Sequence, residues 1–168
     1  LYRIEDKSIC RLIPTTFGAV LVEISYLEAP SHCLTVQLLA ETQHLPEKQA
    51  EIVLYIREWF DLTTDLTGFY QMGQQDILLQ EPIAKFYGLR LIGIPDLFEA
   101  LAWGILGQQI NLAFAYTLKQ RLVEAYGSAK LHEGQSYWSF PTPEKIAQLE
   151  VADLLPLQLS QRKSEYLI

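Results

Sequence analysis

Residues 97–127 predict two helices joined by a very short corner, and this pair constrains the fold more than any other stretch. The first helix carries one apolar stripe of helical period. Its members are Phe98, Leu101, Ala102 and Ile105. This helix is expected to end at Gly107, because glycine most easily takes the left-handed conformation that closes many helices. Asn111 is a favourable N-cap for the second helix, which Gly127 ends.

Two adjacent glutamines, Gln108 and Gln109, occupy the corner between the predicted helices. Glutamine is a common solvated turn residue, and its amide can pair with carbonyl groups that a helix end leaves without partners. On spacing alone, the favoured interpretation of both is therefore a surface amide, with a functional role as the alternative.

Several segments resemble one protein family in the same order along the chain. FEALAWGILGQQIN, at residues 98–111, resembles the corresponding segment of the AlkA-like DNA-3-methyladenine glycosylases, which belong to the helix-hairpin-helix DNA glycosylase superfamily. The other matching segments are WFDL at 59–62, GLRL at 88–91, FPTPE at 140–144 and RKSE at 162–165. The resemblance covers roughly residues 50–168, and the occurrence of several segments in the same order argues against chance.

The resemblance implies roles for the residues of the corner. A DNA glycosylase must turn its target nucleotide out of the duplex before it can cleave the bond to the base. By resemblance, Gln109 enters the base stack and fills the hole, and Gln108 lines the pocket for the extruded base. Gly107, Ile110 and Asn111 form the helix corner that supports them.

The catalytic carboxylate that the resemblance implies is not found in residues 1–168. The family's glycine-rich hairpin, followed by a Gly-Pro-Asp-like segment, does not occur in this sequence. We therefore expect an N-terminal portion of a glycosylase, inactive alone, with the helix-hairpin-helix and the catalytic Asp beyond Ile168. The parent protein is expected to hydrolyse the N-glycosidic bond of alkylated purines in base excision repair. It would need no cofactor, and the sequence shows no metal-ligand motif.

The first part of the chain predicts strands and the rest predicts helices, so the expected fold class is α+β. Residues 9–40 hold three β-type runs separated by turn residues, and residues 2–6 are a candidate edge strand. From residue 46 the apolar period changes from two to 3.6. We expect an antiparallel sheet module at 1–45, truncated at its N-terminus, followed at 46–168 by the first part of an all-helical glycosylase domain. The resemblance implies a TATA-binding-protein-like sheet.

Local signals predict the smaller elements. Short helices are expected at about residues 66–72 and 75–86. Residues 128–139 show no clear period and predict a surface loop. Thr142 and Ser160 are expected to cap the last helices.

The net charge of −7 and pI near 4.9 have the wrong sign for a protein that grips phosphate. We therefore expect that the 168-residue chain does not bind DNA alone. The parent's contacts with damaged double-stranded DNA would come largely from backbone amides beyond Ile168. Two alternatives are an 8-oxoguanine-type DNA glycosylase, which shares both modules, and a non-enzymatic helical interaction module, which the acidic charge favours.

No apolar run is long enough to span a bilayer, and the N-terminus has no signal-peptide pattern. The cysteines, Cys10 and Cys33, are expected to be buried, reduced thiols. These features predict a cytoplasmic monomer with no membrane partner.

Overall fold

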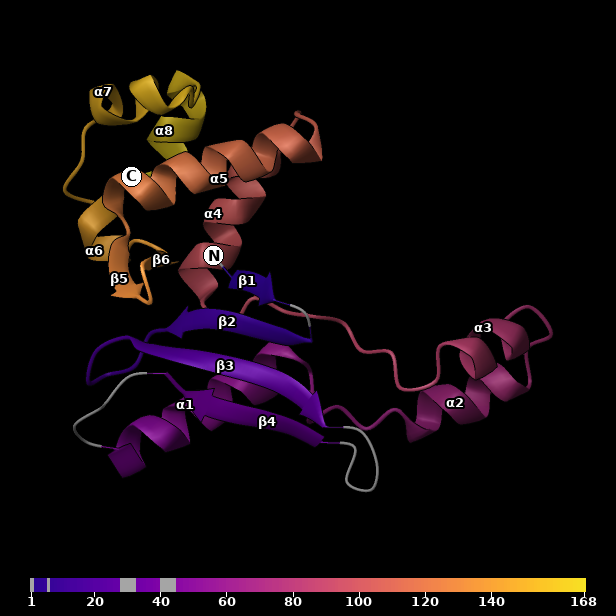
Figure 1. The fold of residues 1–168 in the computed structure, drawn as a ribbon. Helices are drawn as coiled ribbons and strands as arrows, with labels where there is room; N and C mark the ends of the chain where they lie inside the picture. Colours follow the sequence, from indigo (N-terminus) through magenta and orange to yellow (C-terminus); the bar gives the residue numbers. More distant parts are fainter. Residues whose placement is uncertain (1, 6, 28–32, 40–44) are drawn as a thin grey trace. The chain divides into compact units, whose positions relative to one another are not determined.

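A four-stranded antiparallel sheet followed by helices forms the computed structural model, which describes residues 2–5, 7–27, 33–39 and 45–168 (Figure 1). The predicted α+β class is confirmed. The structure divides into two units, Leu1–Ile52 with Asp96–Ile168, and Val53–Pro95. This division differs from the predicted domains at 1–45 and 46–168, which stay a prediction.

The strands follow one another in the sheet in chain order. They are β1 (Tyr2–Glu5), β2 (Ser8–Ile13), β3 (Val20–Leu27) and β4 (Cys33–Leu38). Strand β1 pairs with β2, so the candidate edge strand is confirmed. Leu21 is buried on one face of β3 together with Cys10 and Leu12 of β2. Cys33 is exposed, against prediction, because it begins the edge strand β4.

The helices α4 (Leu97–Gly107) and α5 (Leu112–Tyr126) form the predicted pair, and Asp96 and Asn111 cap them. The buried face of α4 is rotated from the predicted stripe: Ala102 and Leu106 are buried, whereas Leu101 is exposed. The buried face of α5 consists of Ala115, Leu118, Leu122 and Val123. The core that the pair shares with the C-terminal helices consists of Ala102, Leu106, Leu118, Leu122, Ile146, Leu154, Leu159 and Leu167.

The predicted surface loop at 128–139 is wrong, because this segment forms a hairpin of β5 (Ser128–His132) and β6 (Gln135–Ser139). Its two turn residues, Glu133 and Gly134, have φ values of 48° and 76°. Positive φ at both positions is the geometry of a type I′ turn, which suits the twist of a two-residue hairpin. Tyr137 of β6 is buried against the Cys10 face of the sheet, so the hairpin joins the sheet to the helices.

Four short elements complete the first unit: α6 (Pro143–Ile146), α7 (Val151–Leu154), the 3-10 helix η1 (Leu155–Leu157) and α8 (Gln161–Leu167). The predicted caps are confirmed. Thr142 accepts a hydrogen bond from the Lys145 backbone N–H, and Ser160 accepts one from the Lys163 backbone N–H, both at 3.3 Å.

The unit of residues 53–95 contains the second half of α1 (Leu45–Trp59), together with α2 (Thr67–Gln74) and α3 (Gln80–Lys85). Helix α3 starts later than predicted, because the Asp76 carboxylate accepts a hydrogen bond from the Leu78 backbone N–H at 2.8 Å. Such a local turn competes with helix formation.

Among the described residues, no helix has the length and apolar character that crossing a membrane requires. The same part of the chain contains no group of three or more His, Cys, Asp or Glu residues placed to hold a metal ion.

Candidate functional site at the corner between α4 and α5

The corner consists of the four residues between the end of α4 at Gly107 and the start of α5 at Leu112. Gln109, not Gly107, adopts the left-handed conformation, with φ of 56°. Gly107 completes the last helical turn, and the chain reverses two residues later. A non-glycine residue in this region costs about 1 to 2 kcal/mol, so the surrounding structure must hold the corner in place.

Two residues, Ile110 and Asn111, support the corner, and two others form its tip. Ile110 is half-buried and packs against the core. The Asn111 side chain accepts a hydrogen bond from the Phe114 backbone N–H at 2.9 Å and so fixes the start of α5. Gln108 and Gln109 are exposed. The five predicted site residues therefore lie together at the corner, and the amides of Gln108 and Gln109 are open to solvent.

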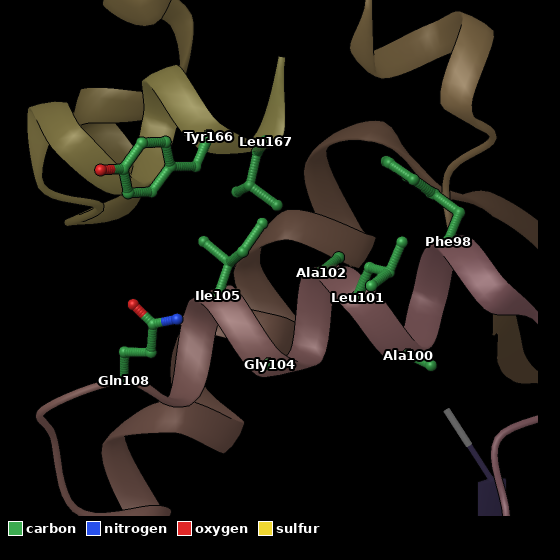
Figure 2. A pocket seen from close by; sticks show the side chains of 9 residues that line it. All are labelled: Phe98, Ala100, Leu101, Ala102, Gly104, Ile105, Gln108, Tyr166 and Leu167. Atoms are coloured by element: carbon green, nitrogen blue, oxygen red, sulfur yellow. The ribbon is translucent and has the colours of Figure 1, made fainter.

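Gln108 lies at one end of a groove of about 450 Å³ between α4 and α8. Figure 2 shows Ile105 and Leu167 pointing toward each other across this groove, and Gln108 at the C-terminal end of α4. The groove is lined by Phe98, Ala100, Leu101, Ala102, Gly104, Ile105, Gln108, Tyr166 and Leu167. The lining residues are mostly apolar, and Gln108 and Tyr166 are those with a polar group in the side chain.

Gly104 in the wall of the groove has room for a side chain. A Cβ atom built there meets no heavy atom within 4 Å, and the residue is exposed in the interior of α4. We expect Gly104→Ala to raise the free energy of unfolding by about 0.5 to 1 kcal/mol, because alanine restricts the unfolded backbone. Urea unfolding followed by circular dichroism measures this, and a less stable variant would contradict it.

A buried ion network joins the sheet to both helices of the corner. The Glu99 carboxylate on α4 lies 3.1 Å from Arg11 Nη2 on β2 and 2.8 Å from Lys119 Nζ on α5. Glu99 and Arg11 are 3% and 6% exposed. Lys119 Nζ also lies 5.0 Å from the centre of the Trp103 ring. This network was not predicted from the sequence; the signal for it is that Glu99 is the only charged residue within α4.

A second polar contact that was not predicted joins α8 to the last turn of α4, next to the corner. Lys163 Nζ on α8 donates a hydrogen bond to the Leu106 carbonyl oxygen at 2.7 Å. Burial lowers the pKa of Lys163 from its ordinary value, because desolvation disfavours the charged amine. No local sequence signal connects these two residues.

Two family models together match almost the whole chain. The model of the 8-oxoguanine DNA glycosylase N-terminal domain matches residues 3–101. The model of HhH-GPD superfamily base excision DNA repair proteins matches residues 102–168. The family that the sequence segments predicted is confirmed.

Curated relatives include two DNA-3-methyladenine glycosylases. The protein of Bacillus subtilis (strain 168) is 49% identical over 169 residues, which cover 100% of this chain and 55% of the relative. DNA-3-methyladenine glycosylase 2 of Escherichia coli (strain K12) is 37% identical over 81 residues, 48% of this chain and 28% of the relative. The chain thus spans about half the length of its Bacillus subtilis relative.

Solved structures share the fold across the chain. The 3-methyladenine DNA-glycosylase from Archaeoglobus fulgidus has a TM-score of 0.79 at 24% identity, covering 99% of this chain and 56% of that chain. The Clostridium acetobutylicum 8-oxoguanine glycosylase/lyase, solved with double-stranded DNA containing cytosine opposite 8-oxoG, has a TM-score of 0.64 at 17% identity. It covers 99% of this chain and 62% of that chain. At these identities the likeness shows the fold alone. From these matches, the chain belongs over residues 3–101 to the 8-oxoguanine DNA glycosylase N-terminal domain family, and its residues 102–168 match the model of HhH-GPD superfamily base excision DNA repair proteins.

Proposed function

We propose that this chain is part of a DNA glycosylase that flips out and excises alkylated purines, of the 3-methyladenine type, in base excision repair. The observation that carries the proposal is the 49% identity to the Bacillus subtilis DNA-3-methyladenine glycosylase, which extends over the whole chain. The reaction is hydrolysis of the N-glycosidic bond without a cofactor. The catalytic Asp is proposed to lie beyond Ile168, so the 168-residue chain alone is expected to be inactive.

The exposed corner suits the mechanical part of this reaction. An extruded nucleotide leaves a hole in the stack and an unpaired partner base. In the proposal, Gln109 enters the hole, where its amide fills space and hydrogen-bonds the orphaned base. Gln108 contacts the extruded base. Gly107, Ile110 and Asn111 hold the two glutamines between rigid helices, as a preorganised site requires.

Damaged double-stranded DNA is the proposed partner of the complete gene product. The Clostridium acetobutylicum glycosylase/lyase, a relative by fold, was solved in complex with duplex DNA. The same proposal includes a monomeric, cytoplasmic protein with no membrane partner.

The test is base release by the complete gene product from a duplex that carries one N-alkylated purine. We expect Gln109→Ala to slow excision about tenfold, because nothing then offsets the cost of unstacking the target. A single-stranded substrate has no hole to fill and should be affected less. The measurement is alkali-labile cleavage at the lesion under single-turnover conditions. Gln120→Ala, at an exposed glutamine on α5, is the matched control and should leave the rate unchanged.

The second candidate is an 8-oxoguanine glycosylase, because that family's N-terminal domain model matches residues 3–101. It is weaker, since the high sequence identity is to 3-methyladenine enzymes. An 8-oxoguanine:cytosine duplex with borohydride trapping separates the two, because a lyase forms a Schiff base through an amine.

Equal excision rates for Gln109→Ala and the unsubstituted protein would contradict the role of Gln109. No base release from any lesion and no binding to abasic DNA would favour the interaction module.

A further inference from the structure

Helix α8 is joined to the C-terminal end of α4 by one polar contact. Lys163 Nζ donates to the Leu106 carbonyl oxygen at 2.7 Å. The last four carbonyl groups of a helix have no partner within the helix, and a positive charge near them is favourable. The contact therefore gives the Leu106 carbonyl a hydrogen-bond partner in the last turn of α4, next to the corner.

The position of Lys163 is fixed from several sides. Its backbone N–H donates to Ser160 Oγ at 3.3 Å, within the cap of α8. Four residues further on, Leu167 is buried in the same core as Leu106. The Nζ is partly withdrawn from water, consistent with the lowered pKa of Lys163. Movement of α8 would therefore displace the end of α4 with it.

The corner needs such support. Leu106 is two residues before Gln108 and three before Gln109, whose φ of 56° is unfavourable for a residue with a side chain. A backbone in a sparsely populated region persists only when its surroundings determine it. Asn111 fixes the end of the corner that leads into α5 through its cap, and Lys163 fixes the end that follows α4.

We propose that Lys163 is a positioning residue, which holds the Leu106 carbonyl and so presents Gln108 and Gln109 to a DNA duplex with an extruded base. The inference rests on the proposed function of the corner. It differs from a direct contact of the lysine with phosphate, because the ammonium group is already bonded to α4. The two roles predict different salt dependences, since each lost phosphate contact lowers the salt slope of binding by about one.

The experiment compares affinities of the complete gene product for a duplex with a tetrahydrofuran abasic site and for the same duplex undamaged, at several salt concentrations. The variants are Lys163→Met, Lys163→Arg, Gln109→Ala and the Lys163→Met/Gln109→Ala pair. Arg162→Met is the matched control, because it removes one positive charge from the exposed face of α8. Urea unfolding establishes that each variant is folded, and Lys163→Gln replaces Lys163→Met if the latter is not.

We expect Lys163→Met to reduce the preference for the abasic duplex about three- to tenfold without changing the salt slope. Lys163→Arg should restore the preference, because a guanidinium can donate to the same carbonyl. The double variant should prefer the abasic duplex as much as Gln109→Ala alone does, since the orientation of the corner affects this preference only while Gln109 is present.

Two results would overturn the inference. One is equal weakening on both duplexes with a salt slope lower by about one, which would make Lys163 a phosphate contact. The other is that the effects of Lys163→Met and Gln109→Ala on the preference for the abasic duplex add fully. An unsubstituted protein without preference for the abasic duplex would instead contradict the proposed function, and the positioning role with it.

Discussion

Glu99→Gln is expected to lower the free energy of unfolding by about 3 to 5 kcal/mol, because it removes the negative charge from a buried carboxylate that contacts two cations. Arg11 and Lys119 both contact the Glu99 carboxylate, at 3.1 Å and 2.8 Å. The Arg11 side chain is 7% exposed and that of Lys119 is 15% exposed, so water replaces the lost anion poorly. A neutral amide keeps the shape of glutamate and removes its charge. Urea unfolding monitored by circular dichroism measures the difference.

Two variants control this experiment. Glu124→Gln makes the same chemical change on the exposed face of α5, and it should alter stability by less than about 0.5 kcal/mol. The triple variant Arg11→Met, Glu99→Leu, Lys119→Met should recover most of the loss, because well-packed apolar residues often replace a buried ion network without penalty. A Glu99→Gln variant as stable as the unsubstituted chain would show that water reaches these cations.

Gly127→Ala is expected to cost about 3 kcal/mol, because a Cβ atom has no space at the junction of α5 and the β5–β6 hairpin. An alanine Cβ would lie 2.4 Å from the Ser139 carbonyl oxygen and 2.5 Å from that of Val123. Both are backbone atoms, so no side-chain rotation relieves the overlap. The φ of −73° suits any residue, which makes the effect one of space rather than of backbone conformation.

Gly104→Ala is the matched control, because the same substitution in an open position should act with the opposite sign. Thermal and urea unfolding of the two variants side by side measure the contrast, and hydrogen exchange should place the loss in Gly127→Ala at residues 128–139. A Gly127→Ala variant within about 0.5 kcal/mol of the unsubstituted chain would mean that the hairpin can move away from α5 at little cost.

The features that the sequence predicted correctly depend on neighbours in the chain. Asn111, Thr142 and Ser160 each accept a hydrogen bond from a backbone N–H three residues later. Such caps can be read locally, because donor and acceptor lie within one helical turn. The location of the corner could be predicted from these caps, and the strands of the sheet could be predicted from their amino-acid composition.

The missed features depend on partners far away in the chain. Arg11 meets Glu99 through the packing of β2 near α4, and Lys163 meets Leu106 through the packing of α8. The hairpin at 128–139 buries only Tyr137, so it lacks the alternation that marks a half-buried strand. The left-handed Gln109 was missed because glycine is the usual residue for that conformation.

The division of the structure also has a consequence for how the chain acquires its fold during synthesis. The first unit is assembled from Leu1–Ile52 and Asp96–Ile168, so its two pieces are separated by the whole of Val53–Pro95. On a ribosome adding about 5 to 20 residues per second, the sheet emerges seconds before Tyr137 can cover it. The Cys10 face of β2 and β3 therefore stays open to solvent during that interval, which makes this face the surface that a chaperone would meet on the nascent chain.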